Sequence, residues 1–183
     1  MAYLNKMKVE LKNIKHCQAL SHETNAFTAK VYVDGKHVGD AENSGHGGCT
    51  GVRTAWKGEK DEKGYPIYSD ADTLAIKELE EWAKKNNKYG LEGLIDDLLY
   101  EELDWREYQK IKRKDLLYYD PVEDAVYPIC KNTFTQKQIK SGGVEAGLAE
   151  TTWWKDGFVF LNPIGKKEFM AKYSNALKPK VKV

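Results

Sequence analysis

The chain has 183 residues, of which 41% are hydrophobic and 11% aromatic. This apolar content is enough to build a buried core, and it excludes an intrinsically disordered chain. Lysine and arginine together number 29 against 28 aspartates and glutamates, a formal net charge of +1. The charge balance therefore indicates neither a general nucleic-acid binder nor a protein of membrane surfaces.

Arginine is scarce among the basic residues, with Arg53, Arg106 and Arg113 set against lysines at all other basic positions. Because bidentate recognition of phosphates and bases depends on the planar arginine fork, a lysine-rich surface favours solvation over sequence-specific readout.

Cysteine usage and hydropathy indicate the compartment. The three cysteines, Cys17, Cys49 and Cys130, are odd in number and far apart, so they do not form a disulfide framework. No stretch approaches the roughly 18 apolar residues of a membrane helix, and the N-terminal residues lack the apolar core of a signal peptide. We expect a cytoplasmic protein with no membrane segment.

The first third of the chain has the pattern of strands. Phe27, Ala29, Val31 and Val33 alternate with polar residues, which predicts a half-buried strand. The Asp-Gly pair at 34–35 predicts a tight turn, with residues 37–42 as the partner strand. Residues 8–15 form a further predicted strand with an irregular pattern, because the apolar side chain at position 14 falls on the opposite face from those at 9 and 11.

Three further hairpins are predicted from turn residues between apolar runs. They join position 56 to residues 65–68, residues 116–119 to 125–129, and residues 151–154 to 158–161. Hairpins join antiparallel strands, whereas parallel strands need long crossovers. The expected fold class is therefore α+β, with an antiparallel sheet built of β-hairpins, a central helical pair and a short C-terminal helix.

The helices are concentrated in the middle of the chain. Ser69 followed by Asp72 resembles a capping box, which opens a helix with Ala75, Leu79, Trp82 and Ala83 on one face. A second helix is predicted from about residue 91 to 111, and a short one over 165–176. No linker-like segment divides the chain. We predict a single domain over residues 1–176 and a flexible basic tail at 177–183.

A glycine-rich segment, residues 43–51, carries the densest chemical character. Glycine loses more backbone entropy on ordering than other residues, so four glycines in seven positions require a reason. Either their amides converge on an anion, or the loop passes close to another backbone. The segment matches neither a Walker A loop nor a Rossmann fingerprint. For the anion site, the candidate ligand-binding residues are Asn43, Ser44, Gly45, His46, Gly47, Gly48, Thr50 and Arg53.

Histidine and cysteine raise two other interpretations. His46 and Cys49, with His16, Cys17 and His22, are residue types that bind zinc, but the paired C-x-x-C spacing of structural zinc sites is missing. We expect no metal and no cofactor. Alternatively, Cys49 and His46 form a nucleophilic pair in a small enzyme acting on a phosphorylated or acyl substrate.

The predicted helical pair is acidic. Between positions 78 and 107, ten carboxylates face four basic residues. The candidate partner-binding residues are Asp96, Asp97, Glu101, Glu102 and Trp154, the last as an exposed aromatic anchor. Such a face is either simply solvated or a mimic of nucleic-acid charge. The basic residues 110–114 and the lysine-rich tail leave direct binding of nucleic acid as an alternative. Lysines near a helix C-terminus are, however, also stabilised by the helix dipole.

The run at 27–51, FTAKVYVDGKHVGDAENSGHGGCTG, resembles the N-terminal part of small accessory proteins of bacteriophages and prophages, in which a strand, a DGK turn, a strand and an Asn-x-Gly-x-Gly-Gly loop follow in order. This resemblance implies a protein made inside an infected bacterium to inhibit host defence, and it carries no catalytic residue. We expect a binding protein, not an enzyme, that occludes an effector protein such as a CRISPR nuclease. The alternative is sequestration of a phosphate-containing nucleotide signal by residues 43–51. A homo-oligomer stays open.

Overall fold

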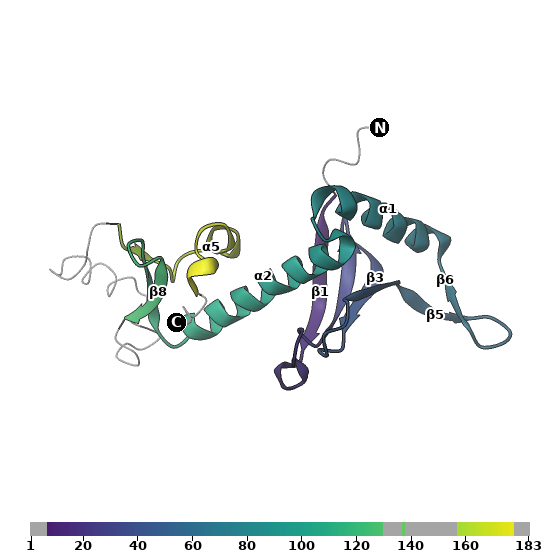
Figure 1. Cartoon of the computed structure of the whole chain (residues 1–183), viewed down its shortest axis with the longest axis horizontal. Coiled ribbons are helices and arrows are strands. Elements are labelled where there is room, and N and C mark those ends of the chain that lie inside the picture. Colours follow the sequence, from purple (N-terminus) through teal and green to yellow (C-terminus); the bar gives the residue numbers. More distant parts are fainter. Residues whose placement is uncertain (1–6, 130–136, 138–156, 178–183) are drawn as a thin grey trace. The chain divides into compact units, whose positions relative to one another are not determined.

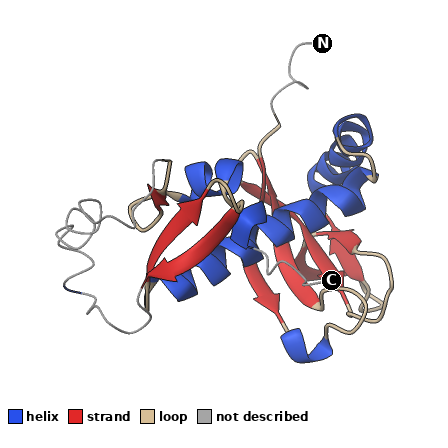
Figure 2. Ribbon diagram, turned by 60° about the vertical axis from the view of Figure 1, so that its left-hand side comes forward, coloured by secondary structure: helices blue, strands red, loops and turns tan. Residues whose placement is uncertain are grey.

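The computed structural model describes residues 7–129, 137 and 157–177, and it has the expected α+β class (Figure 1; Figure 2). The chain groups into two compact units, unit 1 (Met1–Tyr100) and unit 2 (Glu101–Val183), where the sequence predicts one domain over 1–176. The boundary between the units lies inside helix α2 (Gly90–Lys112). Because a continuous helix crosses the boundary, no linker composition marks it in the sequence.

Unit 1 contains a four-stranded antiparallel sheet in the order β1-β2-β3-β4. Its strands are β1 (Val9–His16), β2 (Phe27–Val33), β3 (Lys36–Asn43) and β4 (Gly51–Thr54). The predicted alternation in β2 is confirmed, because Phe27, Ala29 and Val31 are buried. The predicted turn is also confirmed: Asp34 and Gly35 both have positive φ, at 48° and 83°, as a type I′ hairpin turn requires.

A β-bulge explains the irregular pattern of β1. Lys12 pairs with Lys30, and the next pair is Lys15 with Thr28, so β1 carries one residue more than β2 in this interval. Asn13 takes the left-handed conformation there, with φ at 53°; asparagine tolerates this conformation better than most residues. The extra residue returns Ile14 to the buried side of the sheet.

Helix α1 (Asp70–Asn86) packs against β3 and β4. It buries Ile76, Leu79 and Ala83, whereas Ala75 and Trp82 of the predicted face are only partly buried. Gly39 of β3 lies beneath the helix, and a Cβ there would be 2.8 Å from Ile76 Cδ1. The missing side chain therefore lets the helix approach the sheet closely.

The predicted capping box does not form. Ser69 is the N-cap residue of α1, but its side chain makes no capping hydrogen bond. Asp72 is instead fully buried, with Oδ1 2.8 Å from Lys36 Nζ and Oδ2 paired with Lys57. Hydrogen bonding by Lys36, and then by Lys57, holds the pKa of Asp72 below its ordinary value. The carboxylate thus joins α1 to the first residue of β3 and to the hairpin that follows β4.

That hairpin comprises β5 (Trp56–Lys60) and β6 (Pro66–Tyr68), and all residues of both strands are exposed. Its turn is ordered by Asp61, whose Oδ1 accepts hydrogen bonds from the amides of Lys63 and Tyr65. The predicted hairpin is confirmed, with a shorter loop than the sequence indicates.

Unit 2 contains a three-stranded antiparallel sheet in the order β8-β7-β9. Its elements are β7 (Leu116–Asp120), β8 (Ala125–Ile129), β9 (Val159–Phe160), helix α5 (Lys166–Lys172) and the 3₁₀ turn η3 (Asn175–Leu177). The predicted β7–β8 hairpin is confirmed. The first strand of the last predicted hairpin lies outside the described residues, as does the tail from 178 onward.

The core of unit 2 is centred on an aromatic stack. Tyr108 of α2 stacks on Phe169 of α5 with 4.1 Å between ring centroids, and its hydroxyl donates to the Leu161 carbonyl. Burial raises the pKa of Tyr108, so the hydroxyl remains a donor. Asn162 adds a second link: its Oδ1 accepts from the Leu117 amide at 2.6 Å, and its Nδ2 donates to the Asp115 carbonyl at 3.2 Å.

Candidate functional site

Asn43 is the centre of the glycine-rich loop. Its Oδ1 accepts hydrogen bonds from the Gly45 amide and the Thr24 hydroxyl, both at 2.8 Å. Its Nδ2 donates to the Gly48 carbonyl at 2.8 Å and to Thr50 Oγ1 at 3.2 Å. The buried Asn43 side chain therefore forms hydrogen bonds with residues at both ends of the loop and with Thr24 in the segment that faces it.

The loop is fastened to the segment between β1 and β2. The Gly45 carbonyl accepts from the amides of His22 at 3.0 Å and Glu23 at 3.1 Å. Gly45 has φ of +87°, and a Cβ there would collide with the Leu20 carbonyl oxygen and lie 2.8 Å from Ala26 Cβ. The Gly47 amide donates to Thr24 Oγ1 at 3.3 Å. Close approach of two backbone segments thus accounts for Gly45, and the left-handed conformation, with φ of +81°, accounts for Gly47.

Thr50 connects the end of the loop to α2. Its amide donates to Glu92 Oε1 at 3.0 Å, and its hydroxyl donates to Asp96 Oδ1 at 2.7 Å. Burial, opposed by the Thr50 hydrogen bond, raises the pKa of Asp96. The amides of Gly45, Gly47 and Thr50 already have protein acceptors, and two carboxylates face the loop. These contacts favour a structural loop over an anion-binding nest.

The remaining candidates of the loop do not converge on one point. Ser44, His46, Gly48 and Cys49 are exposed. His46 stacks on His22 with 5.2 Å between ring centroids. Arg53 lies on the sheet, where its Nη2 is 2.6 Å from Glu42 Oε2.

Among the described residues, no metal-ligand cluster accompanies the histidines and the two cysteines. Within residues 7–129, 137 and 157–177, no group of three or more histidine, cysteine, aspartate or glutamate side chains could hold a metal ion. Cys17 and Cys49 are exposed free thiols.

The acidic residues of α2 serve separate contacts. Asp96 accepts from Thr50, and Asp97 accepts from Asn87 Nδ2 at 2.8 Å. Glu102 forms ion pairs with Arg106 at 2.9 Å and Lys166 at 2.6 Å. Partial burial acts to raise the pKa of Glu102, but hydrogen bonds from these two cations lower it overall. Glu101 is exposed. Trp154 lies outside the described residues.

Helix α1 presents a second acidic surface, on the side opposite its buried face. Asp70, Leu74, Glu78 and Glu81 follow one another at helical spacing, and we call them the α1 solvent face. Leu74 is 57% exposed although it is apolar. Glu81 pairs with Lys84 at 2.7 Å. Sequence reasoning included Glu78 and Glu81 in the acidic helical pair but missed Leu74, whose signal is an apolar residue on the wrong side of the helical period.

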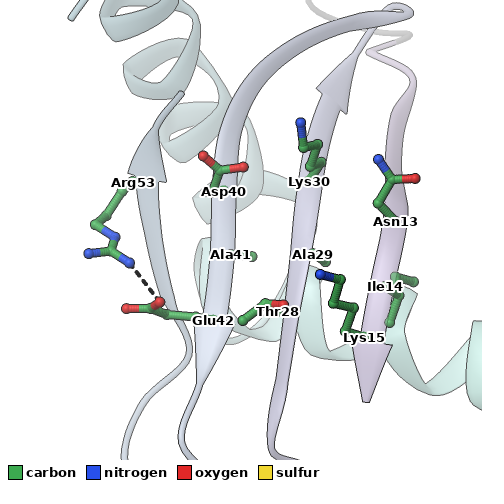
Figure 3. A pocket seen from close by; sticks show the side chains of 10 residues that line it. All are labelled: Asn13, Ile14, Lys15, Thr28, Ala29, Lys30, Asp40, Ala41, Glu42 and Arg53. Carbon is green, nitrogen blue, oxygen red and sulfur yellow. Dashed lines mark ion pairs between the residues drawn. The ribbon is translucent and has the colours of Figure 1, made fainter. Parts of the chain in front are cut away.

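The side of the four-stranded sheet opposite the buried face of β2 has mainly polar and charged side chains, and we call it the outer face (Figure 3). Strand pairing arranges its side chains in rows. The rows are Lys15, Thr28 and Glu42; then Lys12, Lys30, Asp40 and Arg53; then Glu10, Tyr32 and His37. The alternation of β2 already separates Thr28 and Lys30 from the core, but the neighbours on β1 and β3 become known only from the pairing.

The first two rows enclose a hollow of about 630 Å³. Its lining side chains include Asn13, Lys15, Thr28, Lys30, Asp40, Glu42 and Arg53 (Figure 3). The short side chain of Thr28 lies between the longer ones of Lys15 and Glu42 and leaves the space open. Arg53 is the one member of this set that sequence reasoning selected.

The basic end of α2 also has internal contacts. Lys112 lies with its Nζ 5.3 Å from the Tyr108 ring centroid, and burial lowers its pKa. Lys110 pairs with Glu107 at 3.3 Å. These contacts, together with the end of α2 at Lys112, agree with a capping role for residues 110–114.

Comparison with protein-family models, curated proteins and solved structures finds no match. Among the helices of the described part of the chain, none combines the length and the apolar content that crossing a bilayer requires.

Proposed function

We propose that the chain is a non-enzymatic accessory protein of a bacteriophage or prophage that inhibits a host defence system by binding an effector protein. The setting rests on the resemblance of residues 27–51. The observation that carries the binding mode is the α1 solvent face, where Asp70 and Glu78 lie one turn before and one turn after an exposed leucine.

The chemistry of this surface suits a basic groove. A defence nuclease holds nucleic acid in a positively charged channel, and a row of carboxylates spaced along a helix competes for the same positive charges. Complementary charges accelerate association. Leu74 supplies an apolar contact that becomes buried on binding, as the central residue of an interface does.

The α1 solvent face is better suited to this role than the acidic residues of α2. Glu102 is already neutralised by Arg106 and Lys166, and Asp96 is used by Thr50. Asp70 and Glu78 are exposed, and no described side chain pairs with either of them. Their charge remains available to a partner.

Phage plating tests the proposal. Bacteria that carry a CRISPR nuclease directed against a phage are supplied with the wild-type chain, with E78K/E81K, or with E62K/E123K. The last variant makes the same change of net charge at exposed positions of two turns outside α1. Asp70 is left unchanged because a carboxylate in the first turn stabilises the helix.

We expect the wild type and E62K/E123K to restore plating, and E78K/E81K to restore it at least about tenfold less. For the purified chain, E78K/E81K should weaken binding to the nuclease at least about tenfold, which corresponds to about 1.4 kcal/mol. The affinity of the purified chain for the nuclease should fall as ionic strength rises. Unrestored plating by the wild type, or equal restoration by E78K/E81K, contradicts the proposal.

A further inference from the structure

We propose that the hollow on the outer face binds a small phosphorylated polyol, such as a sugar phosphate or a nucleotide, with the phosphate held by Lys15 and Lys30. This site is distinct from the α1 solvent face, and the inference does not depend on the function proposed above.

Some charged side chains around the hollow are paired within the protein, and others have no partner of opposite charge among the described residues. Glu42 is paired with Arg53 at 2.6 Å, and Asp40 Oδ1 is 3.2 Å from His37 Nε2. Lys15 and Lys30 are both exposed, and neither has a carboxylate partner among the described residues. The β1–β2 side of the hollow therefore has an excess of positive charge.

The long, flexible side chains of the two lysines start close enough together on the sheet to reach one anion. They lie in adjacent rows of neighbouring strands, since Lys15 pairs with Thr28 and Lys30 is two residues further along β2. Side chains in such a diagonal arrangement are about 7–8 Å apart at the backbone, within reach of long side chains. Lysine binds phosphate as a mobile point charge. Asn13 and Thr28 line the same space and add an amide and a hydroxyl (Figure 3).

The opposite side of the hollow favours a ligand with hydroxyl groups. Asp40 and Glu42 of β3 supply carboxylate oxygens, which accept hydrogen bonds and would repel a second phosphate. The volume of about 630 Å³ suits a ligand of this size. None of the described side chains that line the hollow is aromatic, so recognition rests on the phosphate and the hydroxyls, with no stacked base required.

Titration of the ¹⁵N-labelled full chain, in buffer without phosphate, tests the site. The probes are ribose 5-phosphate, inorganic phosphate and ribose. We expect ribose 5-phosphate to shift the amide signals of residues 13–15, 28–30 and 40–42 saturably. Ribose should not shift them, and inorganic phosphate should bind several-fold more weakly than ribose 5-phosphate.

Paired variants identify the lysines as the cause. K15M/K30M should weaken binding of ribose 5-phosphate at least about tenfold, because two charged hydrogen bonds are lost. K77M/K85M, which removes two exposed lysines of α1, should bind like the wild type. K15R/K30R should retain binding, which separates loss of charge from damage to the fold.

Titration with AMP then distinguishes a nucleotide from a sugar phosphate as the ligand. Binding of AMP that is tighter than binding of ribose 5-phosphate indicates a nucleotide, and equal binding indicates a sugar phosphate. Either result supports the site. The site is wrong if ribose 5-phosphate gives no saturable shift or if K15M/K30M binds like the wild type. Equal affinity for inorganic phosphate and ribose 5-phosphate would refute the assignment of Asp40 and Glu42 to ligand hydroxyls.

Discussion

The glycines of the loop at 43–51 differ in how much space a Cβ would have at each position. Gly45 has positive φ and touches the Leu20 backbone, whereas a Cβ at Gly48 would meet no atom within 4 Å. Gly45→Ala should lower the free energy of unfolding by at least about 2 kcal/mol, from the left-handed conformation and the collision together. Gly48→Ala should change it by no more than about 0.5 kcal/mol. Urea unfolding measures both, and equal midpoints would show that the loop does not need its close approach.

Sequence reasoning located this loop but could not choose between its two uses. The high density of glycine is a local signal, whereas the reason for Gly45 is the Leu20 carbonyl, 25 positions earlier in the chain. The acceptors Glu92 and Asp96 lie still further away, on α2. Only the folded arrangement shows that the loop amides are already occupied.

At the scale of elements, Asp72 fastens α1 to two segments that precede it in the chain. Asp72→Asn removes the buried charge opposite Lys36 and Lys57, and it should lower the free energy of unfolding by about 2 kcal/mol at pH 7. The folded-state pKa of Asp72 lies below its ordinary value of 3.8, so its contribution is complete above that pH and is lost as the pH falls through the folded-state pKa.

The measurement is urea unfolding of the wild type and Asp72→Asn between pH 7 and pH 2. The difference between the two proteins should shrink below about pH 4. Glu80→Gln is the control, because Glu80 is exposed on the same helix; it should behave like the wild type. A difference that does not change with pH would argue against an ionic contribution.

Elements with local signals were predictable. The hairpin at 34–35 depends on its own two turn residues, and the helix starting at Asp70 depends on its own period. The capping box failed because Ser69 and Asp72 have the right spacing, yet the lysines of two other segments compete for the carboxylate. The bulge in β1 also required knowledge of the neighbouring strand.

At the scale of the whole molecule, the side chains of unit 2 form a core of their own. Tyr108→Phe removes the hydroxyl donor to the Leu161 carbonyl, which keeps the Ile164 amide as its other donor, and should destabilise that core by about 0.5–1.5 kcal/mol. Hydrogen exchange should therefore accelerate by about two- to tenfold in β7 and α5 and stay unchanged in β1 to β4. Tyr127→Phe, at an exposed position of β8, is the control. Equal acceleration in both sheets would mean that the units unfold together.

The extra residue of β1 affects the shape of the outer face but not its charges. Deleting Asn13 would restore one-to-one pairing between Lys12–Lys30 and Lys15–Thr28, so that Ile14 still faces the core and each charged side chain keeps its row. The bend that a bulge gives its strand would disappear. A change in chain length by one residue thus alters the curvature of this surface and keeps all its charged side chains. Related chains could in this way differ in the shape of the ligand they bind while their outer faces keep the same charges.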